Sequence, residues 1–373
     1  MIYLDNAATT KPYDVVIQKA LKYLQNDFFN PSALYRGGLD SANEIKTAKQ
    51  TILKSLCATN HEVVFTSCGS ESDNTAIFSS RRGILVSTEG EHSAVYKTFL
   101  ELKQRGREIF FAPLNPDGSV NTAVLFDFLE KNKVDFVSVM HVNNETGAIN
   151  DVNKIAKRVK EIKKDTIFHS DGVQAFGKIP YRLAPEIDLY SISAHKINAP
   201  KGVGALIKKK NSVVVPLIYG GGQENGLRSG TENVFGIKAF QYATELHYDE
   251  LKDNYDKVSK LNELVRNGLD CELFNILSSK NASPYILSVS AKGIRGEVLM
   301  HALEQKDVIV GNGSACSSKN RFSRVIKACG YGDEILDGVI RISFSPENTE
   351  EEINDAVSLI NQTAKELKEK LGK

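Results

Sequence analysis

Near the middle of the chain stands the stretch DLYSISAHK, residues 188–196. Its first part, Asp188–Ile192, is rich in apolar, β-branched and aromatic side chains, which is typical of a buried strand. Polar residues follow at once and end in Lys196. A lysine beside small and polar residues just after an apolar strand can lose proton affinity by desolvation and act as a Schiff-base amine. The alternative is a surface lysine, which is the commoner fate of this residue type.

Six further runs of similar composition flank this stretch and predict strands. They are Glu62–Thr66, Gly83–Ser87, Glu108–Ala112, Val134–Met140, Thr166–His169 and Val203–Ile207. Segments with helical apolar spacing lie between several of them, at Ser72–Ser80, Ala94–Gln104, Thr122–Lys131 and Val152–Lys163. This alternation predicts an α/β fold, with a mostly parallel seven-stranded sheet between helices.

The C-terminal part of the chain has a different pattern. Val234–Leu269 predicts one long helix or two. Strand-like and helical segments then mix, at Pro284–Ser290, Gly296–Gln305, Asp307–Val310, Gly338–Ser343 and Thr349–Leu371. We therefore expect a large domain over residues 11–245 and a smaller α+β domain over residues 246–373, which residues 1–10 join.

Composition excludes several functional classes. Lys and Arg number 47 against 46 Asp and Glu, so net charge gives no indication of a nucleic-acid or membrane-surface partner. No apolar run approaches the roughly 18 residues of a membrane span, and the N-terminus lacks a signal-peptide pattern. The five cysteines are odd in number and include no C-x-x-C pair, which argues against disulfides and structural metal sites. We expect a cytoplasmic protein without a metal, in which Cys57, Cys271 and Cys329 are buried.

Four predicted strands end in polar clusters, at residues 66–71, 141–145, 169–174 and 191–196. Any one cluster alone would be an ordinary loop. In open α/β sheets, however, ligands bind outside the carboxyl ends of the strands. Four clusters at corresponding strand ends therefore favour a binding site.

Two of these clusters indicate a particular chemistry. Gly69 and Ser70 stand between a strand and a helix, where backbone N–H groups favour an anion; the alternative is a simple cap by Ser70 or Ser72. Asp171 at an apolar strand end is unfavourable unless it is paired, and a pyridinium nitrogen is a fitting partner. A Schiff-base lysine with such an aspartate is the pattern of pyridoxal phosphate enzymes. Asp171 could instead cap a helical turn over residues 172–174.

Two loops carry further signals. GGGQENGLRSGT, residues 220–231, could cradle a phosphate or approach another subunit, and could equally be a flexible loop. GNGSACSSKNR, residues 311–321, places Cys316 among small polar residues with cations nearby. This composition predicts an exposed cysteine in which the thiolate is favoured. Cys68 is expected to be structural.

The ordered set of motifs resembles the cysteine desulfurases of the NifS/IscS type, group I, within the class V, fold-type I pyridoxal phosphate enzymes. The motifs are YLDNAATT at residues 3–10, NPS at 30–32, EHSAV at 91–95, NNETG at 143–147, HK at 195–196, RSGT at 228–231 and GSACSS at 313–318. They run nearly from one end of the chain to the other.

The resemblance implies roles for individual residues. Lys196 would carry the cofactor, Asp171 would pair with its ring nitrogen, and Gln174 would bind its phenolic oxygen. His92 would stack on the ring and move protons. The phosphate ligands would be Gly69, Ser70, Ser193, His195 and, from the neighbouring subunit of a homodimer, Thr231. Asn144 and Arg341 would hold the substrate carboxylate, with Asn144 also near the cofactor.

The resemblance also implies the reaction. Sulfur leaves L-cysteine as a persulfide on Cys316, alanine is released, and an acceptor protein such as an iron–sulfur scaffold takes the sulfur. Rival functions are a selenocysteine lyase or a small-amino-acid aminotransferase on the same fold, and a non-catalytic sulfur-carrier scaffold. Cys316 argues against an aminotransferase, which has no use for a nucleophile there. The joint presence of Lys196, Asp171, His92 and Cys316 argues against a degenerate site.

Overall fold

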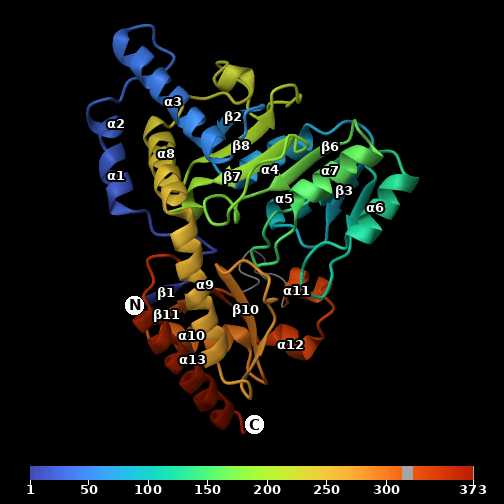
Figure 1. Ribbon diagram of the computed structural model, residues 1–373, viewed down its shortest axis with the longest axis vertical. Helices are drawn as coiled ribbons and strands as arrows, with labels where there is room; N and C mark the ends of the chain where they lie inside the picture. The colour runs from blue at the N-terminus through green and yellow to red at the C-terminus, as the bar shows by residue number, and fades with distance from the viewer. Residues whose placement is uncertain (313–321, 373) are drawn as a thin grey trace.

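The computed structural model describes residues 1–312 and 322–372 (Figure 1). Its centre is a seven-stranded sheet in the order β2-β8-β7-β6-β5-β3-β4. The strands are β2 His61–Thr66, β3 Ile84–Thr88, β4 Ile109–Ala112, β5 Val134–Ser138, β6 Ile167–Asp171, β7 Leu189–Ser193 and β8 Gly204–Lys209. All pair in parallel except β8, which is antiparallel to both of its neighbours. The predicted mostly parallel sheet is therefore confirmed.

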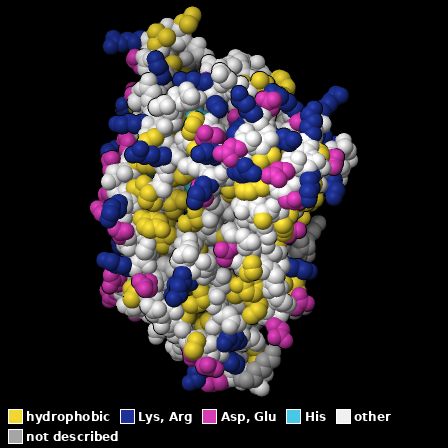
Figure 2. Space-filling view, turned by 45° about the vertical axis from the view of Figure 1, so that its right-hand side comes forward, with side chains coloured by type: hydrophobic (Ala, Val, Ile, Leu, Met, Phe, Trp, Pro, Cys, Tyr) yellow, Lys and Arg dark blue, Asp and Glu magenta, His cyan; other side chains and the backbone are white. Residues whose placement is uncertain are grey.

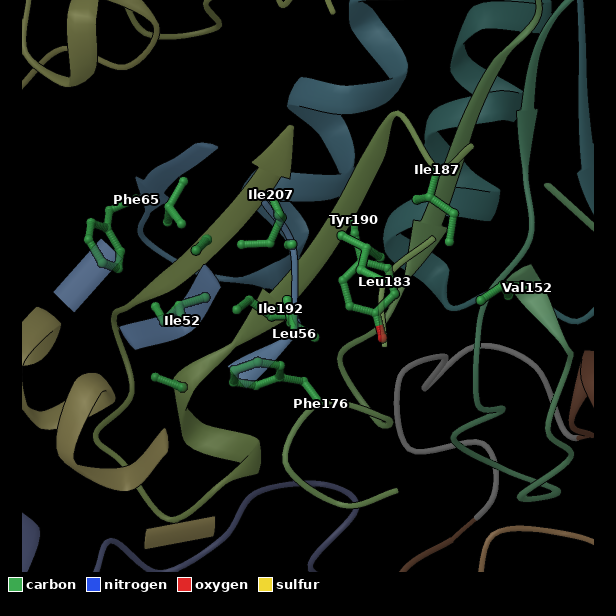
Figure 3. Packing of buried hydrophobic residues seen from close by; sticks show 14 of the residues in the cluster. Ile52, Leu56, Phe65, Val152, Phe176, Leu183, Ile187, Tyr190, Ile192 and Ile207 are labelled. Atoms are coloured by element: carbon green, nitrogen blue, oxygen red, sulfur yellow. The ribbon is translucent and has the colours of Figure 1, made fainter. Parts of the chain in front are cut away.

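Helices cover both faces of this sheet. On one face, α4 Gly69–Phe78 and α5 Ser93–Gln104 share a hydrophobic core with inward-facing residues of β3, β5, β7 and β8. The other face carries α1 Asp14–Ala20, α3 Arg36–Ser55, α6 Thr122–Lys131, α7 Val152–Ile162 and α8 Val234–Asp249. Figure 3 shows side chains of α3, β7 and β8 meeting in this second core, where Ile52, Ile192 and Ile207 are fully buried. The strands thus bury both faces, as expected for parallel sheets.

A further core lies below the central sheet in Figure 1. It contains a three-stranded antiparallel sheet, β12-β10-β9, and a parallel pair, β1-β11. These strands are β1 Ile2–Leu4, β9 Phe274–Ile276, β10 Ile286–Ala291, β11 Val308–Val310 and β12 Val339–Ser343. The helices α9 Leu251–Gly268, α10 Gly296–Glu304 and α13 Glu350–Lys370 pack with them, while α11 Arg324–Ala328 and α12 Asp333–Asp337 lie beside a small separate cluster. We call this part of the molecule the lower core. The domain boundaries at residues 10 and 245 stay a prediction.

The N-terminal strand belongs to the lower core although it precedes the whole central sheet in the chain. β1 pairs with β11, and Asp5 bridges to Ser343 at the end of β12. The segment after β1 then crosses to the central sheet, where Thr10 N–H donates to His195 O at 3.0 Å. Residues 5–10 therefore bind the lower core to the carboxyl edge of the central sheet.

Several elements have no counterpart among the sequence predictions. These are β1, α1, the four-residue helix α2 Lys22–Gln25, α3, β9, α11, α12 and the short 3-10 turns Ala194–Lys196 and Glu224–Gly226. Most are only three to seven residues long, too short for a hydrophobic period to be seen. The single predicted segment Val234–Leu269 is two helices, α8 and α9, separated at Glu250.

Candidate active site

A cavity of about 610 Å³ lies at the carboxyl ends of β2, β3, β5, β6 and β7. The predicted convergence of polar strand ends is therefore confirmed. Residues that both the sequence singled out and the structure places on the cavity wall are Gly69, Ser70, His92, Asn144, Asp171, Gln174, Ser193, His195, Lys196 and Arg341. Ala7 and Ala8, after β1, and Ser323 and Arg324, at α11, complete the wall from the other side.

Lys196 enters the cavity from the short turn that follows β7. Its Nζ donates to the carbonyl oxygens of Ala7 at 2.6 Å and Ala8 at 2.7 Å. The side chain is half-buried. The amine is therefore held at the cavity by the crossing segment rather than spread over the surface, and the surface-lysine alternative is wrong.

Asp171 is the last residue of β6 and is 5% exposed. Its Oδ1 accepts the N–H of Val173 at 2.9 Å, so the expected turn does form, but no helix follows. Burial raises the pKa of Asp171 to about 6, although the Val173 N–H and the charge of Lys196 both lower it. Glycine at position 172 is required here, because a Cβ there would overlap the ring of Tyr190.

A second carboxyl group, that of Asp73, lines the same cavity as Asp171. Asp73 of α4 is 1% exposed, its Oδ1 has no hydrogen-bond partner, and it is 3.6 Å from Nε2 of His169. Burial and the charge of Asp171 raise the pKa of Asp73. Burial lowers the pKa of His169 to about 3, so its ring is neutral and gives Asp73 no full positive charge. Burial and the charge of Asp171 therefore favour the neutral form of Asp73.

The N-terminus of α4 faces the cavity without an internal cap. Cys68 occupies the N-cap position and its side chain makes no cap hydrogen bond; among the described residues, no side chain accepts the N–H of Gly69 or Ser70. Ser72 bonds instead to Thr66 Oγ1 at 2.8 Å, so the predicted alternative of a cap by Ser70 or Ser72 is wrong. Beside Gly69, the buried Ser193 Oγ has no hydrogen-bond partner among the described residues. Free N–H groups and a free hydroxyl together suit an anion.

His92 begins α5 and contributes its ring to the cavity wall. Its Nδ1 accepts the N–H of Ala94 at 3.1 Å. Burial, followed by the charges of Lys196 and Arg324, lowers the pKa of His92 to about 4. The ring is therefore neutral near pH 7, and because Nδ1 accepts, the proton lies on Nε2.

Arg341 crosses from β12 to the cavity and is 4% exposed. Its Nη1 donates to Asn144 O at 2.8 Å and its Nη2 to Asp5 Oδ1 at 2.7 Å. Arg341 Nε and Asn144 Oδ1 are buried and have no hydrogen-bond partner within residues 1–312 and 322–372. A bound carboxylate would satisfy Arg341 Nε, whereas Asn144 Oδ1 is an acceptor and would take a donor such as an amine. The carboxylate role of both residues stays a prediction.

His195 lies between the N-terminal segment and the cavity. Its Nδ1 is 3.1 Å from Thr9 Oγ1, and its carbonyl oxygen accepts from Thr10 Oγ1 at 2.9 Å. Burial lowers the pKa of His195 to about 4, with Lys196 and Lys178 adding to the effect. Its neutral ring adds a polar group but no charge to the wall.

Two residues that were predicted for the site are not among the described residues that line this chain's cavity. Thr231 is exposed and is absent from the cavity wall; its predicted role in a neighbouring subunit's site stays a prediction. Cys316 lies outside the described residues. The loop that carries Thr231 is anchored, because Glu224 pairs with Lys49 at 2.6 Å and Arg228 with Glu71 at 3.0 Å.

Sequence reasoning missed Glu91 and Arg324. Glu91 is fully buried, its Oε1 accepts the N–H of Met140 at 2.8 Å, and its Oε2 has no partner. Burial raises the pKa of Glu91 to about 8, and the charge of Asp171 adds to this, so the acid is mostly neutral at pH 7. Arg324 lies 3.7 Å from the ring centre of Tyr96 and donates to Glu91 O at 2.5 Å. Glu91 directly precedes His92, which is the one signal that could have indicated it.

The structure corrects two cysteine predictions. Cys57 and Cys271 are exposed, whereas Cys329 is 6% exposed, as expected. Cys57 follows the end of α3 with φ of 53°, and this left-handed turn carries its side chain away from the apolar face of the helix. Cys68, expected to be structural, lines the cavity.

Neither a metal site nor a membrane span is found in the part of the chain that the structure describes. No three His, Cys, Asp or Glu side chains among residues 1–312 and 322–372 gather closely enough to hold a metal ion. No helix in these ranges has the length and apolar character to cross a bilayer.

Comparison of this chain with known proteins identifies its family. The model of the aminotransferase class-V family matches residues 2–355. The chain belongs to this family. A cysteine desulfurase of Nostoc sp. is 34% identical over 380 residues, which cover 99% of this chain and 94% of that protein. A solved NifS-like protein is similar with a TM-score of 0.89 and 33% identity, covering 97% of this chain and 98% of the other. SspA, solved in complex with cysteine, has a TM-score of 0.81 and 28% identity, covering 94% and 100% of the two chains.

Proposed function

We propose that this cavity is the catalytic centre of a pyridoxal phosphate-dependent cysteine desulfurase that converts L-cysteine to alanine and a persulfide on Cys316. The proposal rests on three groups that line one cavity. They are the hydrogen-bonded amine of Lys196, the buried carboxylate of Asp171 and the N-terminus of α4, which has no side-chain cap from Cys68. Relatives that span almost the whole chain are named cysteine desulfurases, and none of the rival functions gains comparable support.

The donor set fits pyridoxal phosphate. The backbone N–H groups at Gly69 and Ser70, with the unpartnered Ser193 hydroxyl, suit its phosphate. Asp171 suits its ring nitrogen, since a positive partner would keep this buried carboxyl ionised at neutral pH. The absence of a side chain at Gly69 also matters, because a Cβ there would lie 2.9 Å from a methyl carbon of Val173. When bound, the cofactor stabilises negative charge at the Cα of an amino acid.

The chain's own groups then have separate tasks. Lys196 Nζ would hold the cofactor, and as a free amine it would take the Cα proton of the substrate. The carbonyl oxygens of Ala7 and Ala8 hold this amine in place before substrate enters. His92, with its proton on Nε2, offers a neutral ring to stack on and a donor beside the cavity.

Substrate orientation falls to Arg341 and Asn144. Asp5 fixes one edge of the Arg341 guanidinium, which leaves Nε for the substrate carboxylate. Because Arg341 also donates to the carbonyl oxygen of Asn144, both groups move as one unit. A planar, charged donor of this kind suits carboxylate recognition.

Sulfur transfer requires a thiolate. The Cys316 thiolate attacks the sulfur of the bound cysteine; an S–S bond forms, the substrate C–S bond breaks, and its electron pair remains on the carbon that becomes the alanine methyl group. This assignment rests on the sequence around Cys316 and on the family, since Cys316 lies outside the described residues. Cys57, Cys68, Cys271 and Cys329 are free thiols, so disulfides do not compete among the described cysteines.

We also propose a homodimer that works in the reducing cytoplasm and passes sulfur to an acceptor protein such as an iron–sulfur scaffold. Large apolar side chains are exposed on two loops, among them Phe28 at 68%, Leu34 at 90% and Tyr219 at 76%. Figure 2 shows hydrophobic side chains at the upper end of the molecule, where α3 begins. A second copy that covered these loops would bring the exposed Thr231 toward a cavity other than its own.

Two measurements test the proposed function. The purified protein should show a visible absorption band that borohydride abolishes, with the reduced cofactor recovered on the peptide that contains Lys196. With cysteine and a reductant it should release alanine and sulfide in equal amounts, and Cys316→Ala should keep the band but release no sulfide. Absence of the band refutes the cofactor assignment, and unchanged sulfide release by Cys316→Ala refutes the role of Cys316.

A further inference from the structure

Lys178 is a buried lysine next to the cavity but outside its wall. It is 4% exposed and lies in the turn that follows β6. Burial, followed by the charges of Lys196 and Arg341, lowers the pKa of Lys178 to about 7. Burying an amine among other cations costs free energy, so its partner is informative.

That partner is an amide, not a carboxylate. Lys178 Nζ donates to Gln174 Oε1 at 3.0 Å, and the ring of Tyr285 lies 5.8 Å away. Other buried lysines of the described chain pair with acids: Lys238, 2% exposed, with Glu44 at 2.5 Å, and Lys208, 4% exposed, with Glu62. Pairing with an acid therefore does not explain why Lys178 is buried.

The bond from Lys178 determines which way the Gln174 amide points. The Lys178 amine donates to the amide oxygen. On the other side, the amide nitrogen donates to the carbonyl oxygen of Ala7 at 2.9 Å. Because this carbonyl only accepts and the charged form of Lys178 only donates, one of the two amide orientations satisfies both, and the reverse orientation loses the bond to Ala7.

The same carbonyl joins this arrangement to the catalytic amine. Ala7 O accepts from both Gln174 Nε2 and Lys196 Nζ, the latter at 2.6 Å. Gln174 lines the cavity, and its amide nitrogen has a second hydrogen that Ala7 does not use. This hydrogen can donate to an oxygen of a molecule bound beside Lys196.

We propose that Lys178 is a positioning residue: it holds the Gln174 amide oxygen away from the cavity, so that the amide N–H is presented to the cofactor. The proposal rests on the proposed function, since it assigns the bound molecule as pyridoxal phosphate. Without Lys178, the amide keeps its bond to Ala7 O but has no donor on its oxygen side. It can then swing about the remaining bond, which weakens the presentation of its second N–H to the cavity.

A double-mutant cycle tests this coupling. The dissociation constant of pyridoxal phosphate is measured by equilibrium dialysis for the wild type, Lys178→Met, Gln174→Leu and the double variant. We expect each single variant to bind about tenfold more weakly, which corresponds to about 1.4 kcal/mol. In the Gln174→Leu background, Lys178→Met should cause no further loss. The dialysis needs no cysteine, so its result does not depend on whether the protein releases sulfide.

The control is Lys238→Met, which removes an equally buried lysine on α8 from outside the cavity wall; its cofactor affinity should equal that of the wild type. If Lys178→Met does not fold, Lys178→Leu takes its place in the same cycle. Equal losses from the Lys178 variant with and without Gln174, or no loss at all, would overturn the proposal.

Discussion

The buried acid Glu91 gives a stability prediction with a definite pH dependence. Glu91 is fully buried, and burial raises its pKa to about 8 from the ordinary value of 4.5. In the unfolded chain Glu91 loses its proton near the ordinary pKa. Between that pKa and the folded pKa, the folded protein therefore binds one more proton than the unfolded chain does. The contribution of neutral Glu91 to the free energy of unfolding is therefore fully present below the pKa that Glu91 has in the unfolded chain. It is lost as the pH rises toward the folded pKa of about 8. The substitution Glu91→Gln keeps the shape of the side chain and removes its ionisable proton.

The expected size follows from this pKa difference. One pH unit corresponds to about 1.36 kcal/mol, so keeping Glu91 neutral costs about 4 kcal/mol at about pH 7.5 and about 1 kcal/mol at about pH 5. The amide oxygen introduced by Glu91→Gln can still accept from Met140 N–H and the Thr88 hydroxyl, as Glu91 Oε1 does at 2.8 and 3.0 Å. Relative to the wild type, Glu91→Gln should thus gain about 3 kcal/mol more at about pH 7.5 than at about pH 5.

Urea unfolding of the cofactor-free protein at the two pH values measures this difference. The control is Glu263→Gln, at an exposed position of α9, which should show the same small effect at both pH values. A Glu91→Gln effect that does not change with pH would show that Glu91 is ionised in the folded protein and would refute the reasoning.

Three further substitutions probe the site. Asp171→Asn removes the carboxylate proposed for the ring nitrogen and should weaken cofactor binding about a hundredfold, or about 3 kcal/mol; an unchanged dissociation constant would contradict its role. Ser193→Ala should weaken cofactor binding about tenfold while leaving the cofactor-free protein as stable or slightly more stable, because its hydroxyl is buried without a partner; a loss of stability with unchanged binding would argue for a structural hydroxyl. Arg341→Lys keeps the charge but loses the planar donor, so KM for cysteine should rise about tenfold with a smaller change in kcat, whereas Arg295→Lys, at an exposed position, should leave KM unchanged.

Much of the fold was predictable because its strands are buried on both faces. Runs such as Val134–Ser138 and Leu189–Ser193 stand out as short apolar stretches followed by polar residues. The helix α3 was largely missed, although Ile45, Ala48 and Ile52 are buried at helical spacing. Cys57 was misplaced because a left-handed turn after α3 cannot be read from an apolar run.

The residues of the cavity wall were predictable from strand ends and motifs, and their electrostatics were not. Asp73, Glu91 and Lys178 look in the sequence like ordinary surface charges, and only the structure shows that all three are buried. Their protonation depends on the packing of segments far apart in the chain, such as α4 against β6 and β7. No local pattern carries that information.

The most direct test of the central claim is peptide mass spectrometry of the cofactor-loaded protein after brief treatment with cysteine and no reductant. We expect the mass of one additional sulfur atom on the peptide that contains Cys316, and none on that peptide in Lys196→Ala. Alanine formation without added sulfur on Cys316, or added sulfur on Cys68 in its place, would contradict it.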